Sequence, residues 1–407
     1  MTSVRVTETT CCIAGGGPAG LMLGFLLARS GLDVAVIEKH ADFLRDFRGD
    51  TIHPSTMEIM HELGFLDDFL KLPHEPVPRL VAQFGERRVM LADFARLPVR
   101  AKFIAMMPQW DFLNFIAERA RRYPTFRLVM EAEAHSLIEE GSEVAGVRAR
   151  TSEGPIEFRT KLVVAADGRD SVLRRQSGLE LEDLGAPMDA LWFRLSRLAE
   201  DTTQTQARFE AGAIFVMLNR GDYWQCAFVI PKGGHDRVRA GGIYSFRKSI
   251  GELLPFAPAR ADEIRDWDQV KLLIVQVNRL KTWWRPGFLC IGDAAHAMSP
   301  VGGVGVNLAV QDAVAAANIL AEPLLRGRLD GEHLAHVQKR REWPTRVTQQ
   351  IQLAVQNRII APALAGKPDF QPPLAMRLLA RFPALASLPA RVVGLGVRPE
   401  HVRTEAA

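Results

Sequence analysis

Three consecutive glycines, Gly15 to Gly17, follow an apolar run near the start of the chain and lead directly into a second apolar run. Glycine is unfavourable inside regular structure, so a cluster of it needs a local cause. Either the backbone turns sharply at this point, or it must let a large charged group come close. No other short stretch of the sequence limits the possible folds as much.

The residues around this cluster predict a strand, a glycine turn, a helix and a second strand. The turn has the pattern Gly15-x-Gly17-x-x-Gly20, and the second strand ends at Glu38. In this arrangement the first glycine permits the turn, the second lets backbone N–H groups approach a pyrophosphate, and the third lets the helix pack on the sheet. An acid about 20 residues downstream can bind an adenosine ribose. We therefore predict a dinucleotide site, either NAD or FAD; the alternative is an accidental glycine turn.

Length and charge limit the protein class. A chain of 407 residues is too long for one ordinary core and predicts two or three interleaved domains. Hydrophobic residues make up 47% and charged residues 24%, as in a folded globular protein. The net charge of +4 is spread along the chain without a run of like charges, so we expect no nucleic-acid partner. An acidic small substrate or a phosphate-bearing cofactor fits this charge.

The cysteines and the apolar stretches indicate the cellular compartment and whether the chain spans a membrane. The four cysteines lie in apolar, strand-like segments without metal-ligand spacing, so we expect buried thiols in a reducing compartment and no metal site. No apolar stretch reaches the roughly 20 residues needed to span a bilayer, because Arg29 and Asp33 interrupt the best candidate. The first residues lack the apolar core of a signal peptide. We expect a cytoplasmic protein without integral membrane contact, either a monomer or a homodimer.

Two later segments also run from an apolar strand into a glycine-containing turn. Residues 161–175 contain Ala166-Asp167-Gly168 and then an arginine-rich helix start. Residues 287–320 contain Gly292-Asp293, a short turn up to Pro300, and a second glycine cluster that opens a long apolar helix. With all three motifs in order over most of residues 10–320, the chain resembles the para-hydroxybenzoate hydroxylase-like (class A) FAD-dependent flavoprotein monooxygenases.

The resemblance implies an α/β fold of two domains. A Rossmann-like FAD-binding domain would be interleaved with a substrate domain built on a mostly antiparallel β-sheet, followed by a helical C-terminal extension. The expected bounds are 1–78, 95–184 and 282–330 for the FAD-binding domain, 79–94 and 185–281 for the substrate domain, and 331–407 for the extension.

The same resemblance assigns cofactor contacts to residues of the motifs. These are Gly15, Gly17, Pro18, Ala19, Gly20, Glu38, Lys39, Arg48, Gln109, Asp167, Gly168, Asp293, Pro300, Gly303, Gly305, Val306 and Asn307. Glu38 would bind the ribose and Asp293 the ribityl chain, and the middle motif would lie near the flavin. Gln109 stands where the family often has arginine. Arg48, Pro300 and Gly303 are the expected catalytic positions, at the edge where flavin and substrate meet.

Physical chemistry supports the second glycine cluster independently of the resemblance. A reduced flavin carries negative charge on its pyrimidine side, and the free N–H groups and dipole of a helix N-terminus can stabilise it. Gly302, Gly303 and Gly305 would let the backbone lie against the ring, with Val306 and Asn307 in the first helical turn. A purely structural loop is the alternative.

Residues 185–281 predict alternating strands, at 188–197, 205–219 and 222–233, and then a helical stretch at 241–258. With a hairpin near 79–94, this sheet is expected to cover the substrate pocket, so side chains on one face would meet the substrate. The candidates are His53, Trp192, Arg194, Phe215, Met217, Trp224 and Phe228. Core packing, or a turn position for His53, is the alternative for each, and the sequence does not indicate which face is the pocket face.

The resemblance also implies the chemistry. NADPH or NADH would reduce FAD from a transient site, O2 would form a flavin C4a-hydroperoxide, and one oxygen atom would pass to an electron-rich aromatic substrate such as a phenol. Three alternatives stay open. A halogenase would need a W-x-W-x-I-P stretch, whereas this chain has Trp224, Phe228, Ile230 and Pro231 in the nearest segment. A reductase or saturase would need no oxygen, and a non-catalytic flavin-binding redox partner would turn over no substrate.

Overall fold

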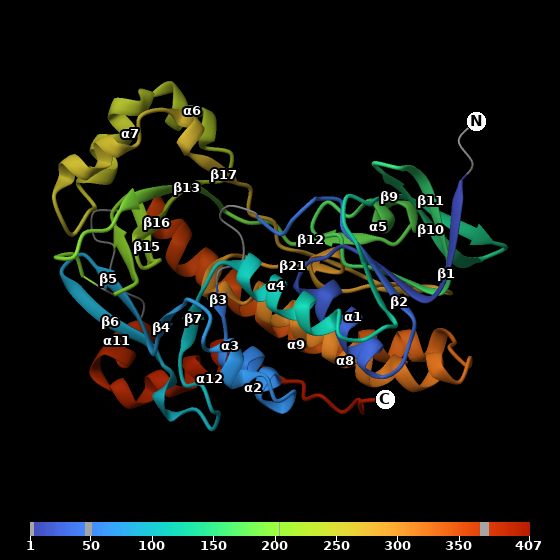
Figure 1. The fold of residues 1–407 in the computed structure, drawn as a ribbon. Helices are drawn as coiled ribbons and strands as arrows, with labels where there is room; N and C mark the ends of the chain where they lie inside the picture. The colour runs from blue at the N-terminus through green and yellow to red at the C-terminus, as the bar shows by residue number, and fades with distance from the viewer. Residues whose placement is uncertain (1–3, 45–50, 203, 367–373) are drawn as a thin grey trace.

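The computed structural model describes residues 4–44, 51–202, 204–366 and 374–407. Figure 1 shows two sheets side by side, with α8 (Gly305–Leu325) and α9 (Gly331–Val355) running along the molecule from one toward the other. The fold class predicted from the sequence is confirmed: a mixed helix-and-sheet protein with one mostly parallel and one mostly antiparallel sheet.

The first sheet contains the strand that precedes the glycine turn. Its order is β19 (Trp284–Arg285), β20 (Phe288–Cys290), β11 (Gly154–Ala165), β1 (Arg5–Ala14), β2 (Val34–Ile37), β8 (Phe126–Val129), with β10 (Glu143–Thr151) and β9 (Glu133–Glu140) joined to β11 as an antiparallel ribbon. The strands β20, β11, β1, β2 and β8 run parallel. Parallel strands covered on both faces need continuous apolar runs, and residues 11–14 and 162–165 are apolar and fully buried.

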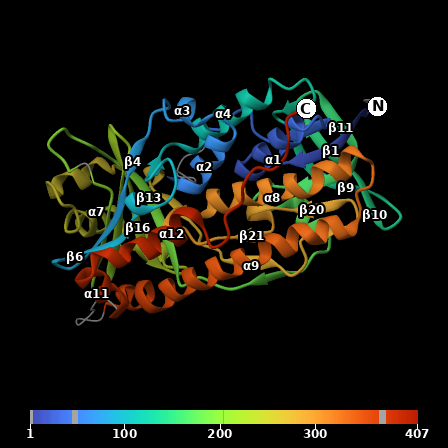
Figure 2. The ribbon, with the colours of Figure 1, turned by 90° about the horizontal axis from the view of Figure 1, so that it is seen from below.

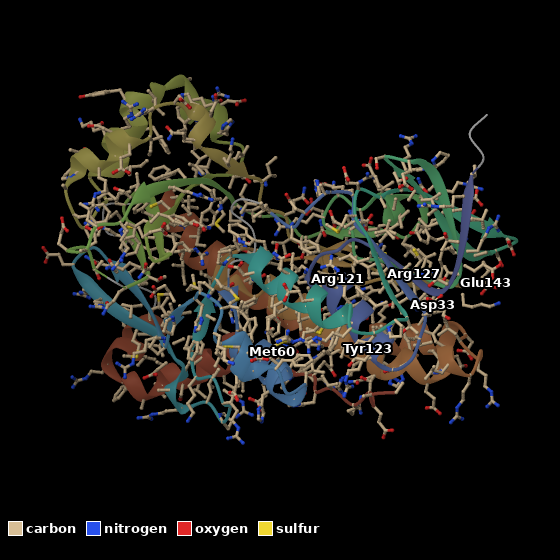
Figure 3. All side chains as sticks on the ribbon, viewed as in Figure 1. Asp33, Met60, Arg121, Tyr123, Arg127 and Glu143 are labelled. Carbon is tan, nitrogen blue, oxygen red and sulfur yellow. The ribbon has the colours of Figure 1, made fainter. Side chains whose placement is uncertain are left out.

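Helices on the first sheet form the largest core. Helix α1 (Pro18–Arg29) packs between the sheet, α8 and α4 (Gln109–Ala120), and its residues 19–28 are all buried. Proline at its first position suits a helix start, where the missing N–H has no intrahelical partner. At the rim of the sheet, Arg127 donates to Asp33 over 2.8 Å, which ties β8 to the start of β2 (Figure 3).

Helix α8 belongs to this core. In the described part of the chain, one stretch is long and apolar enough to cross a membrane, Val301–Leu325, but 83% of its most apolar window is buried inside the protein. Its contacts with α1 and α9 account for that apolar composition. The four cysteines are buried as well, and burial raises the pKa of their thiols, so they stay protonated.

The second sheet combines two distant parts of the chain. Its order is β17 (Lys271–Leu273), β13 (Met188–Ser196), β16 (Tyr223–Pro231), β15 (Ala213–Asn219), β14 (Gln206–Glu210), β5 (Arg79–Phe84), β6 (Arg87–Asp93). The hairpin β5–β6 joins through a parallel pairing of β5 with β14, where Ala82 faces Ala207. This pairing supports the proposed place of residues 79–94 in the substrate domain. The predicted strand at 205–219 is two strands, because a tight turn at Gly212 (φ +88°) reverses the chain.

The remaining elements connect the two sheets or cover them. Two small sheets have the orders β3 (Thr51–Ile52), β7 (Ile104–Met106), β4 (Glu75–Val77) and β12 (Leu181–Asp183), β18 (Asn278–Leu280), β21 (His296–Ala297). The other helices are α2 (Pro54–Glu62), α3 (Leu66–Phe69), α5 (Val172–Gln176), α6 (His235–Ala240), α7 (Gly242–Gly251), α10 (Ala361–Leu364), α11 (Leu374–Arg381) and α12 (Ser387–Leu395). Short 3-10 turns are η1 (Phe94–Arg96), η2 (Pro258–Glu263), η3 (Trp267–Gln269), η4 (Gly292–Ala294), η5 (Val301–Gly303) and η7 (Pro383–Ala386); η6 (Gln356–Ile360) is a π-helical turn.

The last part of the chain crosses the molecule. Figure 2 shows it leaving α12 and running back to the neighbourhood of α1. There Arg29 donates to the Thr404 carbonyl over 2.6 Å, and the Ala407 N–H donates to the Arg29 carbonyl over 2.9 Å. Helices α10, α11 and α12 contact strands β15 and β6 of the second sheet, so the segment after α9 contacts both halves of the fold.

Candidate functional site

The three sequence motifs meet at one edge of the first sheet. The last residues of β1, β11 and β20 pair side by side, Ala14 with Ala165 and Ala165 with Cys290. Because these strands are parallel, the turns that follow them leave the sheet at the same edge. Ligands of open α/β sheets bind outside the carboxyl ends of the strands, so this edge is the candidate site.

The first turn presents the N-terminus of α1 to the candidate site. Gly15 has φ +109° and donates its N–H to the Ile37 carbonyl over 2.8 Å. Gly17 caps α1 with extended backbone, no side chain caps the helix, and its first turn, with Pro18 and the buried Ala19, contains no acid. Its N–H groups and positive dipole end are therefore available to an anion such as a pyrophosphate.

Glu38 lies at the end of β2, beside this turn. One carboxylate oxygen accepts from the Gly16 N–H over 2.9 Å and the other from the His40 N–H over 3.1 Å. Lys39 is exposed. The carboxylate is thus fixed next to the glycine turn, the position that the predicted ribose contact needs, while nothing in the structure singles out the Lys39 side chain.

Two glycines of the site have no structural reason to be glycine. Among the glycines that the structure describes, only Gly17 and Gly305 combine an ordinary φ with no atom within 4 Å of the place where a Cβ would lie. The others have a positive φ or have atoms in the way or in contact. Each of the two stands at the start of a helix, α1 or α8. A group that binds against the backbone accounts for glycine at both positions, and the pyrophosphate and ring of FAD are such groups.

Asp167 and Gly168 follow β11 at the same edge. The Val172 N–H donates to one Asp167 oxygen over 3.0 Å, and the other oxygen is buried without a hydrogen-bond partner among the described residues. Burial raises the pKa of this carboxyl group above its ordinary value. Gly168 has φ +88° with open space around it. A buried acceptor oxygen without a donor can be satisfied by a ligand hydroxyl or N–H.

Asp293 follows β20 and is paired with a residue that the sequence interpretation overlooked. Arg169 donates from Nε to Asp293 Oδ2 over 3.0 Å, and both side chains are about one-third exposed. The same guanidinium donates to the Met298 carbonyl over 3.4 Å. The carboxylate is therefore oriented by the middle motif and still reachable, as a ribityl contact requires. In the sequence, only its position directly after Gly168 could have indicated Arg169 as a residue of the site.

The second glycine cluster forms a tight loop ahead of α8. Pro300 precedes η5, and Gly302 and Gly303 have φ +80° and +63°. The Gly303 carbonyl accepts from the Thr51 hydroxyl over 2.7 Å and contacts His53 Nε2 at 3.0 Å. These contacts from the chain around β3 fix the loop, and the N-terminus of α8 behind it has no side-chain cap.

The first turn of α8 is held by α2. Asn307 Oδ1 accepts from the Ser55 hydroxyl over 2.5 Å and from the Thr56 hydroxyl over 2.9 Å. Asn307 and Val306 are both buried. The backbone of this turn is therefore rigid, whereas Gly305 beside it faces open space.

His53 is not a substrate contact, which corrects the prediction. Its side chain is fully buried, and its two ring nitrogens lie 2.9 Å from the Val393 carbonyl and 3.0 Å from the Gly303 carbonyl. Both nitrogens therefore face protein carbonyls, and the single N–H of the neutral ring is donated to one of them. The residue links α12 to the glycine loop and helps to hold that loop in place.

This burial makes folding sensitive to acid. Burial lowers the pKa of His53 from 6.5 to about 4, although the two carbonyls oppose the shift. Between pH 6.5 and 4 the unfolded chain binds a proton that the folded chain does not, so stability falls as the pH falls through that window. The expected loss is about 3 kcal/mol in total, from about 1.4 kcal/mol per pKa unit. Urea unfolding at pH 7, 5 and 4 should show it, and His53→Asn should lack this component; an equal pH slope in both proteins would contradict it.

Four of the predicted substrate residues lie on the wrong face of the second sheet. Phe215, Met217, Trp224 and Phe228 pack in one apolar cluster with Phe246 of α7. Figure 1 places α7 on the side of the sheet away from α8. Strand side chains alternate between faces, so these four cannot also point toward the cofactor edge.

The opposite face of the same sheet adjoins the glycine loop. Ile214 and Val229 pack there in a cluster with Val301, the first residue of η5. The register of β13 puts Trp192 and Arg194 on this face, opposite to Leu191 and Phe193. Trp192 is partly buried, and the Arg194 guanidinium lies 4.8 Å from the centre of the Tyr223 ring. Of the sheet candidates, these two lie on the face that adjoins the glycine loop, and their contact with a substrate stays a prediction.

Two further predictions concern the edge of the site. Gln109 is the first residue of α4 and is partly buried, which leaves its proposed FAD contact a prediction. Arg48 lies outside the described residues, and its catalytic role also stays a prediction.

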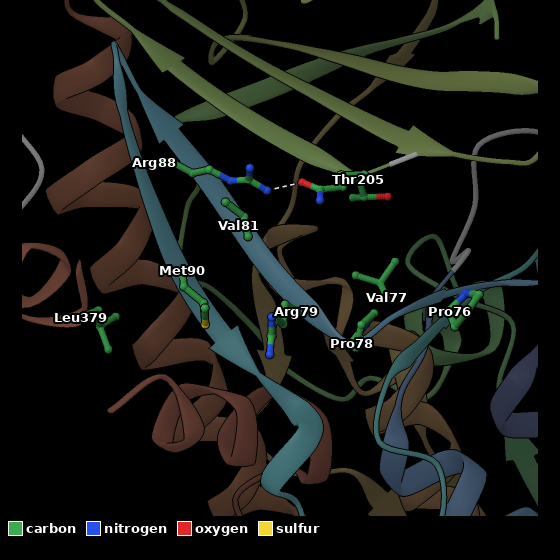
Figure 4. Close-up of a pocket in the computed structure, with 10 residues that line it drawn as sticks. Pro76, Val77, Pro78, Arg79, Val81, Arg88, Met90, Thr205 and Leu379 are labelled. Carbon is green, nitrogen blue, oxygen red and sulfur yellow. Dashed lines mark hydrogen bonds between the residues drawn. The ribbon is translucent and has the colours of Figure 1, made fainter. Parts of the chain in front are cut away.

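A pocket of about 570 Å³ lies elsewhere, beside the β5–β6 hairpin (Figure 4). Its walls include Pro76, Val81, Met90 and Leu379, and Arg88 donates a hydrogen bond to Gln204 across it. None of the predicted site residues lines this pocket. We do not assign it to the cofactor.

Comparison with known proteins agrees with this geometry. Residues 8–351 match the family FAD_binding_3, described as FAD binding domain. The 6-methylpretetramide 4-monooxygenase of Streptomyces rimosus is 31% identical over 390 residues, which cover 95% of this chain and 92% of the relative. Digeranylgeranylglycerophospholipid reductase 2 of Methanothermobacter thermautotrophicus is 26% identical over 367 residues, 87% of this chain and 88% of the relative.

A solved structure shows the same fold. The OxyS anhydrotetracycline hydroxylase of Streptomyces rimosus superposes with a TM-score of 0.77 at 22% identity, over 97% of this chain and 77% of that structure. The family match, the 31% identical relative and the open space at Gly17 and Gly305, where α1 and α8 begin, all indicate FAD as the cofactor. The chain belongs to the FAD binding domain family and is an FAD-dependent monooxygenase.

Proposed function

We propose that this monooxygenase hydroxylates an electron-rich aromatic ring of phenolic type, with O2 as co-substrate and NADPH or NADH as a reductant that binds transiently. The observation that carries the proposal is the sheet face beside the glycine loop, which has the indole of Trp192 and the guanidinium of Arg194. A flat ring can stack on the indole, and a phenolate or carboxylate can pair with the guanidinium. The relative at 31% identity is named as a monooxygenase of 6-methylpretetramide.

The chain supplies binding and orientation in this reaction. The bound flavin would supply the activation of O2 and the transfer of one oxygen atom. Glu38 would accept from the ribose hydroxyls, the N–H groups behind Gly17 would hold the pyrophosphate, and Asp293 would bind the ribityl chain. The N-terminus of α8 would stabilise negative charge on the reduced ring. No acid–base pair is required of the protein.

The mass of the product distinguishes a monooxygenase from a reductase. Purified protein should oxidise NADPH or NADH faster with a phenolic acid or a fused polyphenol present, and the product should be one oxygen atom heavier. The matched control is the same ring without its hydroxyl group, which should stimulate less because it is less electron-rich. O2 uptake should equal the NAD(P)H consumed.

A reductase is the second candidate, because one relative is named as a reductase. In that case NAD(P)H oxidation would depend on substrate, proceed without O2, and give a product heavier by two hydrogen atoms. Bound FAD with no substrate-stimulated NAD(P)H oxidation would instead indicate a redox partner and contradict both.

A further inference from the structure

Residues 393–400, which we call the C-terminal segment, are linked through buried side chains to both loops that face the cofactor edge. The segment includes the end of α12 and the residues after it. It is far in sequence from the three motifs. Two separate chains of buried polar contacts lead from it to the site.

The first chain runs through His53. The Val393 carbonyl lies 2.9 Å from His53 Nδ1, and His53 Nε2 lies 3.0 Å from the Gly303 carbonyl. His53 is fully buried. The end of α12 therefore supports the glycine loop ahead of α8.

The second chain runs through two buried ion pairs. Glu400 Oε1 accepts from Arg341 Nη1 over 3.2 Å, and Arg341 Nε donates to Asp312 Oδ1 over 2.9 Å. The other Asp312 oxygen accepts from the Gly292 N–H over 3.0 Å and lies 2.6 Å from His296 Nε2. All four of these side chains are at most 3% exposed.

Asp312 is the centre of this second chain. Burial alone would raise the pKa of its carboxyl group, but His296 and Arg341 hold it below its ordinary value, so the group stays ionised. One oxygen accepts from the backbone of the turn that contains Asp293, and the other is bound to Arg341. Glu400 pairs with Arg341 and also with Arg340. If Glu400 moved away, Arg341 would keep one buried counter-charge instead of two. The Asp312 carboxylate would then have to balance the charge of Arg341 alone.

We propose that the C-terminal segment is part of the FAD-binding apparatus, with Glu400 and Asp312 as positioning residues for the Gly292–Asp293 turn. The proposal rests on the placement of FAD at this edge. Because coupling between two binding events is reciprocal, docking of the segment strengthens FAD binding, and FAD binding strengthens docking of the segment. A purely structural role would alter stability without this mutual effect.

Two measurements test the coupling. In hydrogen exchange of the wild-type protein, adding FAD should slow exchange of amides in residues 393–400. In fluorescence titrations of apoprotein with FAD, Glu400→Gln should bind about tenfold more weakly, within the usual range for coupled sites. Gln keeps the shape and an acceptor oxygen but removes the charge.

The matched control is His401→Ala. His401 Nδ1 contacts Glu62 Oε1 over 2.5 Å in the same part of the chain, but its side chain is 62% exposed and is not connected to Asp312. This variant should bind FAD like the wild type. The inference is overturned if Glu400→Gln and the wild type bind FAD equally well, or if FAD does not change hydrogen exchange in residues 393–400. If Glu400→Gln does not fold, the exchange measurement decides alone, and failure of the wild type to bind FAD would instead refute the cofactor assignment.

Discussion

Gly17→Ala is expected to fold like the wild type and to lose most of its FAD. The new methyl group would meet no protein atom, and the extended backbone at this position accepts any residue. It would, however, occupy the space through which a pyrophosphate reaches the N–H groups of α1. Loss of one charge-assisted hydrogen bond costs about 1.5–3 kcal/mol, so FAD affinity should fall at least about tenfold.

The control for this variant is Gly241→Ala. Gly241 also caps a helix, α7, and a Cβ there would make only ordinary contacts, at 3.4 Å or more. It should leave both stability and FAD affinity near wild type. Flavin released from equal amounts of each purified protein measures the effect, with urea unfolding of the apoproteins as the check on folding. Wild-type flavin content in Gly17→Ala would remove this turn from the cofactor site.

Gly20→Ala, three residues further on, should have the opposite consequence and fail at folding itself. A Cβ at Gly20 would lie 1.9 Å from the Gly15 carbonyl oxygen, which is backbone and cannot rotate away. Helix α1 is buried against the sheet, α4 and α8, so it has no room to move outward. Overpacking of this kind costs about 3 kcal/mol or more, a large part of the 5–15 kcal/mol that stabilises a typical domain.

The expected observation is little soluble Gly20→Ala protein, with a urea midpoint well below that of Gly17→Ala. FAD in the refolding buffer should rescue little, because the clash lies within the protein. A soluble Gly20→Ala protein with wild-type stability would show that α1 can shift on the sheet and would contradict the packing described above.

The two glycines illustrate why so much of the fold could be predicted from the sequence. A parallel strand covered on both faces needs an apolar run, and a helix that touches the preceding turn needs glycine, so residues 11–20 specify their own local structure. The turns after β11 and β20 repeat that logic. Asp167 and Asp293 could be placed because they come two and three residues after the ends of buried strands.

The face of the second sheet could not be predicted in the same way. Phe215 and Trp224 are as suitable for a pocket as for a core, and only the position of α7 separates the two. A weak signal was present in β13, where Leu191 and Phe193 alternate with Trp192 and Arg194. Purely apolar residues on one face and a cation on the other favour the second as the pocket face.

Long-range contacts were beyond the reach of sequence patterns. His53 resembles a turn histidine because its partners, Val393 and Gly303, are 340 and 250 residues away. In the sequence, Arg341 likewise looks like an ordinary exposed cation of the polar helix α9. In the structure its side chain is fully buried between Asp312 and Glu400. Such pairs depend on the tertiary arrangement and leave no local spacing.

The origin of the oxygen atom in the product tests the central claim most directly. With an accepted phenolic substrate, NAD(P)H and O2 labelled with the heavy isotope of oxygen, one labelled atom should enter the product for each NAD(P)H consumed. Unlabelled O2 in labelled water should give an unlabelled product. Label that comes from water, or substrate conversion that continues without O2, would contradict the assignment of this chain as an FAD-dependent monooxygenase.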